Sequence, residues 1–517
     1  MNKRREKKEL LEAEMKKDSV YLAGLKVAQK ISNNVKIIAE NYFTDTTSVY
    51  FGDIRQDAFN LHAMALACAL NKNAILGGEP GCGKTTSATL VSSVFTGIPM
   101  DLYRKVMISG HPEQTEEKII ARPDYGALMD KKEKVIWQPT VYFPKVIIDE
   151  FNRFPEGKQT MFIDIIETSM FSYLSEVYHN GKKSFFATVN YEDGGNHPII
   201  PPNKDRFSIS LEFNNSASLW INETRKKSDK AKIDLVDEDT SYKLLEFVND
   251  KTKDKKPGFY EEMTKEYKKK LRELNLEVIT KDEYDQFRKA VNQMEFDDYS
   301  DADNTTRSEL FTQHTAAEFN YTPTFGSKRS NDPIDTDTHA KDLASTKVKN
   351  AMSPRALSES WVDFAKGFAL LNGQYVLRKE YLDGIFPYVF GHRCEFDDDF
   401  SSQFRTLNRN VQYDHFLAGK ILEGLNESFR KNDKFYALAQ NIINHFDFDL
   451  NDPAEKKLYE SNKKERNEFV EKNIALLRNV IDQARNGSIE SPLLNKYVEY
   501  MKNGSIYARF EKAVDSN

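Results

Sequence analysis

Short apolar runs separated by helical periodicity mark the stretch from about residue 71 to 215. The runs at 74–76, 146–148 and 185–189 are almost wholly apolar, which is typical of strands that are buried on both faces. Helical patterns lie between them, so the strands need crossover connections and should pair in parallel. The pattern predicts an α/β domain built on a parallel sheet, with a helical run over 51–70 before it.

The pattern changes on both sides of this domain. Residues 1–50 alternate charges and then turn apolar at near-helical spacing, which predicts a helix that packs on something. Charged helices are expected over 258–296, whereas 297–350 is polar and is expected to be loop or disorder. Apolar helical spacing returns at 357–371. These shifts divide the chain into an N-terminal helical extension (1–50), an α/β core (51–215), a charged insertion that is first helical and then flexible (216–352), a compact helical domain (353–395) and a C-terminal helical region (396–517).

The bulk composition sets limits on location and partners. A chain of 517 residues exceeds what one hydrophobic core usually serves, so several domains are expected. Its three cysteines match neither a disulfide framework nor a metal site, which favours a reducing, cytoplasmic compartment. No window approaches the apolar length of a membrane span. The net charge of −6 provides no overall basic field for nucleic acid.

A glycine-rich turn follows the first apolar run and opens a helix. Glycines there let backbone N–H groups curl round a phosphate at a helix N-terminus. Lys84 supplies a point charge to the β- and γ-phosphates, and the Thr85 hydroxyl can bind Mg²⁺. The motif predicts a nucleoside triphosphate site, and its residues do not distinguish ATP from GTP. The turn has the complete pattern G-x-x-x-x-G-K-[ST], and the residues expected to contact nucleotide are Gly78, Glu79, Pro80, Gly81, Cys82, Gly83, Lys84, Thr85 and Thr86.

A pair of acids ends the second apolar run. Asp149 is expected to bind Mg²⁺ through its hydration shell, and Glu150 to polarise the attacking water. An Asp-Glu pair that merely closes a strand at the surface is the alternative. The P-loop upstream at a suitable separation favours the roles at the metal and the water, so the two motifs together predict hydrolysis of the nucleotide.

Further motifs follow in the order found in MoxR-type AAA+ ATPases, and the chain resembles this family over roughly 51–215 and 353–395. The resemblance is carried by five segments after the P-loop. They are Asp149-Glu150-Phe151-Asn152-Arg153, which resembles an extended Walker B motif, 162–167 in the next helix, Ala187-Thr188-Val189-Asn190, which resembles the sensor-1 strand, Asp205-Arg206-Phe207, which resembles the D-R-F segment, and Ser353-Pro354-Arg355-Ala356, which resembles sensor 2.

The resemblance implies an AAA+ P-loop core with a separate small α-helical lid at 353–395, ATP with Mg²⁺, and a homo-oligomer, most often a hexameric ring. Asn190 would hydrogen-bond the attacking water or the γ-phosphate. Arg206 would be an arginine finger that enters a neighbour's active site, and Arg355 would touch the phosphates and couple the lid to the nucleotide state. Arg153 has two readings, a pair across the subunit interface or a cap of the local fold.

Two hairpins are expected inside the core. Asn180-Gly181 is a strong turn signal between 173–177 and 183–186, and the family resemblance implies that this hairpin faces the central pore of the ring. A second strand–turn–strand pattern at 118–138, with its turn at 130–134, resembles an insertion in the family's second helix.

The motifs together predict an ATPase that remodels or activates a protein client. The resemblance implies that the client is a separate chain, in some cases one with a von Willebrand A domain. Two alternatives stay open. A nucleic-acid-translocating motor is disfavoured by the acidic net charge, and a nucleotide-gated structural scaffold is disfavoured by the intact Glu150.

Overall fold

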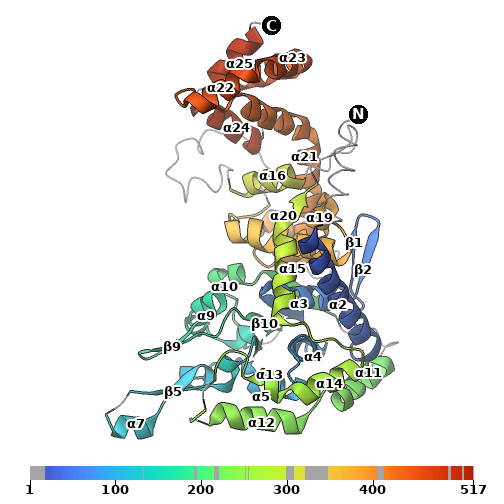
Figure 1. Ribbon diagram of the computed structural model, residues 1–517, viewed down its shortest axis with the longest axis vertical. Coiled ribbons are helices and arrows are strands. Elements are labelled where there is room, and N and C mark those ends of the chain that lie inside the picture. The colour runs from blue at the N-terminus through green and yellow to red at the C-terminus, as the bar shows by residue number, and fades with distance from the viewer. Residues whose placement is uncertain are drawn as a thin grey trace. The chain divides into compact units, whose positions relative to one another are not determined.

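The computed structural model describes residues 18–131, 133–190, 195–214, 221–250, 252–253, 255–297, 308–320, 347–404, 413–486, 491–503 and 506–515. The chain forms two compact units (Figure 1). The first, called the core unit below, comprises Met1–Glu295 and Pro354–Arg393. The second, called the helical unit, comprises Phe296–Ser353 and Cys394–Asn517. The five-part division expected from the sequence stays a prediction.

A five-stranded sheet lies at the centre of the core unit, and all its neighbouring strands are parallel. This confirms the expected α/β class with a parallel sheet, and each of the three apolar runs is a strand. Across the sheet the strands are ordered β11 (Ile209–Phe213), β3 (Ala74–Gly78), β10 (Ser184–Val189), β7 (Lys145–Asp149) and β4 (Ile108–Ser109).

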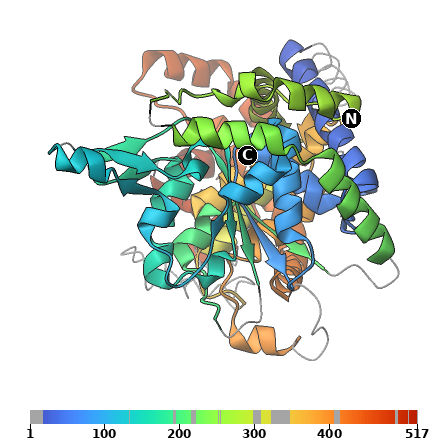
Figure 2. The same ribbon diagram turned by 90° about the horizontal axis from the view of Figure 1, so that it is seen from below.

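Helices cover both faces of this sheet (Figure 2), which is why the strands are buried along their length. In the middle of the sheet, Ala187 of β10 pairs with Ile75 of β3 on one side and with Ile148 of β7 on the other. The covering helices include α3 (Phe59–Leu70), α4 (Lys84–Thr96), α5 (Met100–Val106) and α9 (Phe162–Thr168). The register fixes which strand ends lie side by side.

The expected helical run over 51–70 is wrong in its first part. Ser48–Phe51 (β1) and Ile54–Asp57 (β2) form an antiparallel hairpin that turns at Gly52, where φ is +61°. The helix α3 begins only at Phe59, and every one of its residues is buried. The alternating exposure of the hairpin explains the error, because a short two-stranded ribbon carries little apolar signal.

Helices from distant parts of the sequence complete the core unit. The N-terminal helix α2 (Ser19–Asn41) packs on α15 (Lys281–Gln293) and α18 (Trp361–Leu371). Its buried residues Val27, Ile31, Val35 and Ile38 follow helical spacing, as expected. The charged helices expected over 258–296 are present as α13 (Tyr260–Met263), α14 (Lys265–Glu273) and α15, after α11 (Ile221–Asp234) and α12 (Glu238–Asn249). The segment expected to be a lid contains a π-helix (Arg355–Ser360), α18, β13 (Val376–Leu377) and α19 (Lys379–Phe390).

One of the two expected hairpins forms where the sequence predicts it, and the other turns at a different position. The pattern at 118–138 forms an antiparallel pair of β5 (Ala121–Pro123) and β6 (Val135–Trp137), joined through a short helix, α7 (Tyr125–Met129). The other hairpin pairs β8 (Phe171–Tyr173) with β9 (Glu176–Tyr178), so it turns at 174–175 and not at Asn180-Gly181. The Asn-Gly signal is overridden because the next strand, β10, belongs to the central sheet.

The helical unit contains helices and an isolated β-bridge between Val348 and Phe396 in the part that the structure describes. The longest helix, α21, packs on α16, α23, α24 and α25. The helix α16 corrects the expected loop at 297–350, because Leu310, Phe311 and Phe319 are buried there. The rest of that expectation, at 298–307 and 321–346, lies outside the described residues. The helices are α16 (Ser308–Asn320), α20 (Asp398–Ser402), α21 (Tyr413–Phe446), α22 (Pro453–Ser461), α23 (Lys463–Asn486), α24 (Pro492–Asn503) and α25 (Ile506–Asp515).

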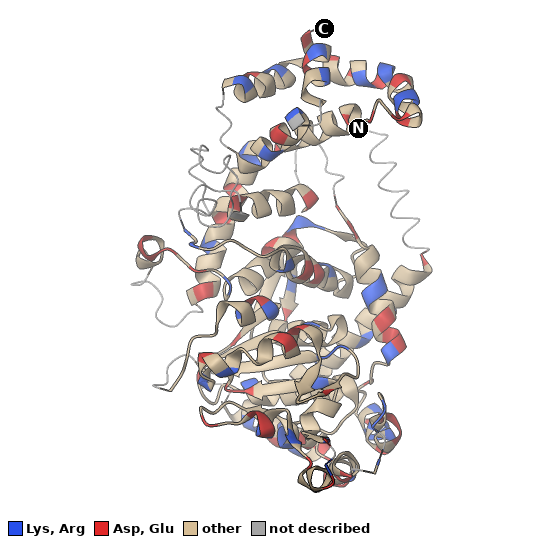
Figure 3. Ribbon diagram, turned by 90° about the vertical axis from the view of Figure 1, so that its left-hand side faces the viewer, with Lys and Arg blue, Asp and Glu red and all other residues tan. Residues whose placement is uncertain are grey.

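Positions of Lys and Arg are interspersed with positions of Asp and Glu along the helices in view (Figure 3). Among the described residues, no helix combines the length and the apolar character needed to cross a membrane.

Candidate functional site

The P-loop joins β3 to α4 through a backbone path that needs glycine. Gly78, Gly81 and Gly83 have φ values of +139°, +83° and +90°, a region that residues with a Cβ rarely adopt. A Cβ on Gly78 would also lie 2.2 Å from the carbonyl oxygen of Phe213. The loop therefore curls tightly ahead of the N-terminus of α4, which is the arrangement that presents backbone N–H groups to an anion.

The Lys84 ammonium group is buried inside this loop. Its Nζ donates to the carbonyl oxygens of Gly78 at 2.6 Å and Glu79 at 2.8 Å, and to Asn190 Oδ1 at 2.8 Å. All three oxygens are uncharged, so the positive charge of Lys84 is held by dipoles rather than cancelled by these partners. A buried ammonium group with uncharged partners suits the binding of an anionic phosphate.

Three hydroxyl and carboxylate groups meet beside the loop. Thr85 Oγ1 donates to Asp149 Oδ1 at 2.6 Å, and Thr188 Oγ1 donates to the same oxygen at 2.7 Å. Thr188 Oγ1 also accepts the backbone N–H of Glu150 at 2.8 Å. A hydroxyl and a carboxylate oxygen this close are the hard oxygen ligands that Mg²⁺ prefers, so the residues present fit the metal expected with ATP.

Glu150 stands at a strained turn directly after β7. Its φ of +54° is left-handed, which is uncommon for a residue other than glycine and is often found at functional sites. Its carboxylate accepts the Asn190 amide at 3.2 Å through Oε1 and lies 3.1 Å from Arg153 Nε through Oε2. Gly110 makes the turn possible, because a Cβ there would lie 2.0 Å from the Glu150 carbonyl oxygen.

Asn152 links the acidic turn to the end of β10. Its Nδ2 donates to the Asn190 carbonyl oxygen at 2.7 Å, and its Oδ1 accepts the Asn190 N–H at 3.4 Å. Both bonds hold the backbone of Asn190, whose side chain lies between Lys84 and Glu150. Five residues with expected roles (Lys84, Thr85, Asp149, Glu150 and Asn190) therefore lie together at the carboxyl ends of three neighbouring strands.

Arg206 and Arg355 lie away from the cluster at the P-loop. Arg206 is at the end of α10 (Pro201–Arg206), just before β11, and Arg355 opens the π-helix. Both contact Glu167 of α9, at 2.5 Å each, and Arg355 also lies 3.4 Å from Asp205. Partial burial opposes ionisation of Glu167, yet the two guanidinium groups lower its pKa below the ordinary value.

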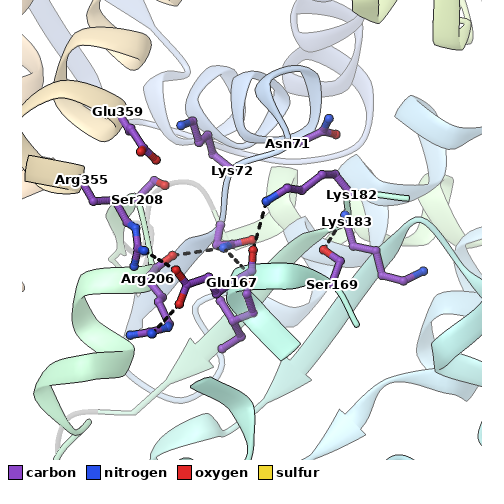
Figure 4. Close-up of a pocket in the computed structure, with 12 residues that line it drawn as sticks. Asn71, Lys72, Glu167, Ser169, Lys182, Lys183, Arg206, Ser208, Arg355 and Glu359 are labelled. Carbon is purple, nitrogen blue, oxygen red and sulfur yellow. Dashed lines mark hydrogen bonds and ion pairs between the residues drawn. The ribbon is translucent and has the colours of Figure 1, made fainter. Parts of the chain in front are cut away.

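These arginines line a polar cavity of about 270 Å³ (Figure 4). Its other walls include 71–73, 182–183 and Ser208, which lead into β3, β10 and β11. The cavity is thus at the amino ends of the strands, whereas the P-loop follows the carboxyl end of β3. Within one chain the structure does not bring Arg206 or Arg355 to the P-loop.

Sequence reasoning gave no role to several residues of these sites. Thr188 could have been found, because positions i and i+2 of a strand share a face and Thr188 is two residues before Asn190. Glu167 belongs to the segment 162–167, but no feature of the sequence marks it individually as a functional residue. No feature marks Arg393 either, yet its buried guanidinium donates to the carbonyl oxygens of Asp205 at 3.1 Å and Phe207 at 2.6 Å and so holds the backbone around Arg206.

No family model matches this chain, and no curated protein matches it in sequence. Among solved structures, a crystal structure of a protein from Cytophaga hutchinsonii, provisionally named an ATPase, is 14% identical. That match covers 80% of this chain and 98% of the other, with a TM-score of 0.48. A likeness at this level carries no argument about function, and the α/β class rests on the parallel sheet of this chain itself.

Proposed function

We propose that this protein is a MoxR-like AAA+ ATPase, which hydrolyses ATP at sites shared between subunits and so remodels or activates a protein client. The observation that carries the proposal is the meeting of Lys84, Asp149, Glu150 and Asn190 at one end of the sheet. Asn190 bonds to both Lys84 and Glu150, and Asp149 bonds to Thr85, the neighbour of Lys84 in sequence. This arrangement supports roles for Lys84 as the phosphate-binding cation, Asp149 as a metal ligand and Glu150 as the base.

In this proposal the loop N–H groups and Lys84 bind the phosphates of ATP. Thr85 and Asp149 would hold Mg²⁺, which neutralises phosphate charge when bound. Glu150 accepts a proton from the attacking water as its oxygen bonds to the γ-phosphorus and the bond to the β-phosphate oxygen breaks. Asn190 would orient that water, and the contact of its amide with the Glu150 carboxylate supports this role.

The placement of Arg206 and Arg355 supports a site completed by a neighbouring subunit. A five-residue strand is about 16 Å long, and the arginines lie at its opposite end from the P-loop. Arginines at one end and a P-loop at the other suit a head-to-tail ring, in which each subunit offers its arginines to the next P-loop. A hexamer is the expected ring, with the 353–395 segment as its lid.

We propose that the client is a protein and that the parts of the chain outside the α/β core and the lid segment recruit it. A separate von Willebrand A-domain protein is one candidate. The cytoplasmic location stays a prediction from cysteine usage.

We expect ATP hydrolysis to move the lid segment and the β8–β9 hairpin, and these movements would act on the client.

The proposal is tested by steady-state ATP turnover of wild type, Glu150→Gln and a matched control, Glu156→Gln, which removes an exposed carboxylate from the next turn. Glu150→Gln should lose at least 100-fold in kcat, since general-base catalysis contributes roughly 10²–10⁴-fold, and should still bind ATP. Wild-type turnover in Glu150→Gln would exclude Glu150 as the base. No turnover in wild type at any protein concentration would exclude an ATPase and favour the nucleotide-gated scaffold.

A further inference from the structure

Glu167 is the point where two arginines from distant parts of the sequence meet. Its Oε2 lies 2.5 Å from Arg206 Nη2, and its Oε1 lies 2.5 Å from Arg355 Nη2. Figure 4 shows the carboxylate between the two guanidinium groups at the wall of the cavity. One carboxylate therefore uses both of its oxygens to hold two cations.

The Glu167 carboxylate reduces the electrostatic repulsion between the two arginines. Two guanidinium groups repel each other, and the repulsion is strongest where water is partly excluded. The Arg206 and Arg355 side chains are only 17% and 30% exposed. Glu167 offsets this repulsion through two charge-assisted hydrogen bonds and so allows the two cations to share one cavity.

The backbone beneath Glu167 is itself fixed to the segment that carries Arg206. Asn73 Nδ2 donates to the carbonyl oxygens of Ile166 at 3.3 Å and Arg206 at 3.1 Å, and Lys182 Nζ donates to the Glu167 carbonyl oxygen at 3.1 Å. Arg206 Nη1 donates to the Pro202 carbonyl oxygen at 2.9 Å. These bonds fix the backbone at Glu167 relative to the segment that carries Arg206, and the Glu167 carboxylate then bonds to both guanidinium groups.

We propose that Glu167 is a positioning residue, which holds Arg206 and Arg355 as one cationic pair that acts on the terminal phosphate of the adjoining subunit's nucleotide. This inference rests on the proposed function. A guanidinium group has five N–H donors, and the Glu167 carboxylate occupies a donor nitrogen on each arginine, so further donors remain for a phosphate. Arg206, Arg355 and Arg393 carry three positive charges against the two negative charges of Glu167 and Asp205, so these five residues keep a net positive charge.

The test is steady-state ATPase kinetics of the full chain carrying Glu167→Gln. A glutamine presents one acceptor oxygen and one donor NH₂, so it accepts from one arginine and repels the other. We expect kcat to fall at least tenfold while the affinity of the chain's own P-loop for ATP, measured by binding, stays within about threefold of wild type, since one misplaced cation loses transition-state stabilisation and not ground-state binding.

A double-mutant cycle separates positioning from a merely structural role. Glu167→Gln should cause little further loss of kcat in an Arg206→Ala chain, because the glutamine oxygen can then accept from Arg355 and no second guanidinium group is left for its NH₂ to repel. A loss that adds in full to that of Arg206→Ala contradicts the proposal, and so does wild-type or increased kcat in Glu167→Gln alone. Glu156→Gln is the control, because it also removes one carboxylate but at an exposed position outside this cavity, and it should keep wild-type kcat.

A replacement variant and the two arginine variants separate a failure of the Glu167 role from a failure of the proposed function. If Glu167→Gln does not fold, Glu167→Asp serves instead, because its shorter side chain keeps the charge but reaches one arginine only, and the same fall in kcat is expected. If Arg206→Ala and Arg355→Ala both turn over like wild type, the shared site of the proposed function fails. If they lose turnover and the Glu167 variants do not, only the role of Glu167 fails.

Discussion

Thr188 holds Asp149 and Glu150 in place at the same time. Its hydroxyl donates to Asp149 Oδ1 at 2.7 Å and accepts the Glu150 N–H at 2.8 Å, and the side chain is 1% exposed. One hydroxyl on β10 therefore fixes both the carboxylate expected to bind the metal and the left-handed turn expected to present the base.

Thr188→Val replaces this hydroxyl with a methyl group of the same shape. The Glu150 N–H then has no Thr188 partner, at a cost of about 1–3 kcal/mol, and the turn is expected to relax. We predict a fall in kcat of roughly tenfold or more, with ATP affinity little changed because Lys84 and the loop are untouched. Thr188→Ser keeps the hydroxyl and should retain most of the turnover. Equal kcat for the Val and Ser variants would contradict the role of the hydroxyl.

Two glycines of the P-loop should differ sharply in their tolerance of alanine. Gly81 has φ +83° but its Cβ would meet nothing within 4 Å, so Gly81→Ala should cost only the left-handed strain of about 1–2 kcal/mol. Gly78→Ala adds a clash at 2.2 Å with a backbone oxygen. We expect it to lose more stability in urea unfolding and to lose ATP binding as well. Equal losses in the two variants would show that the loop does not have this path.

Lys183 should make stability depend on pH. Burial, and then the nearby Lys145, lower the pKa of Lys183 from 10.5 to about 7. Between these two values the unfolded chain binds more protons than the folded one, so the free energy of unfolding rises with pH. The difference between wild type and Lys183→Met should rise in favour of wild type above pH 7, by at most about 1.4 kcal/mol per pH unit.

Urea unfolding from pH 7 to 9.5 measures this difference. Lys182→Met is the matched control, because Lys182 is adjacent and exposed, and its difference from wild type should stay constant with pH. A constant difference for Lys183→Met as well would mean that the amine is not buried as the structure has it.

The local features of the core were open to prediction because they depend on neighbours in sequence. The strands at 74–76 and 146–148 are apolar enough to be buried on both faces, and the glycines of the P-loop are required by its backbone path. Arg206 lies at the opposite end of the sheet from the P-loop. This also follows from chain order, because Arg206 comes before a parallel strand and the P-loop comes after one.

Other features depend on contacts that sequence spacing does not encode. The Asn180-Gly181 turn was expected from a strong local preference, but pairing of 184–189 in the central sheet prevailed. The cluster of Glu167, Arg206 and Arg355 joins three separate segments. The ion pair of Arg355 with Glu167 exists only once the lid segment packs beside α9.

The central claim is that ATP is bound and hydrolysed between subunits. The most direct measurement is the mass of the Glu150→Gln chain by light scattering, with and without ATP and Mg²⁺, because this variant should hold ATP without turning it over. The account predicts a nucleotide-dependent shift to a ring, expected to be a hexamer, that Arg206→Ala weakens. A chain that stays monomeric with ATP bound would contradict the shared site and the roles proposed for Arg206 and Arg355.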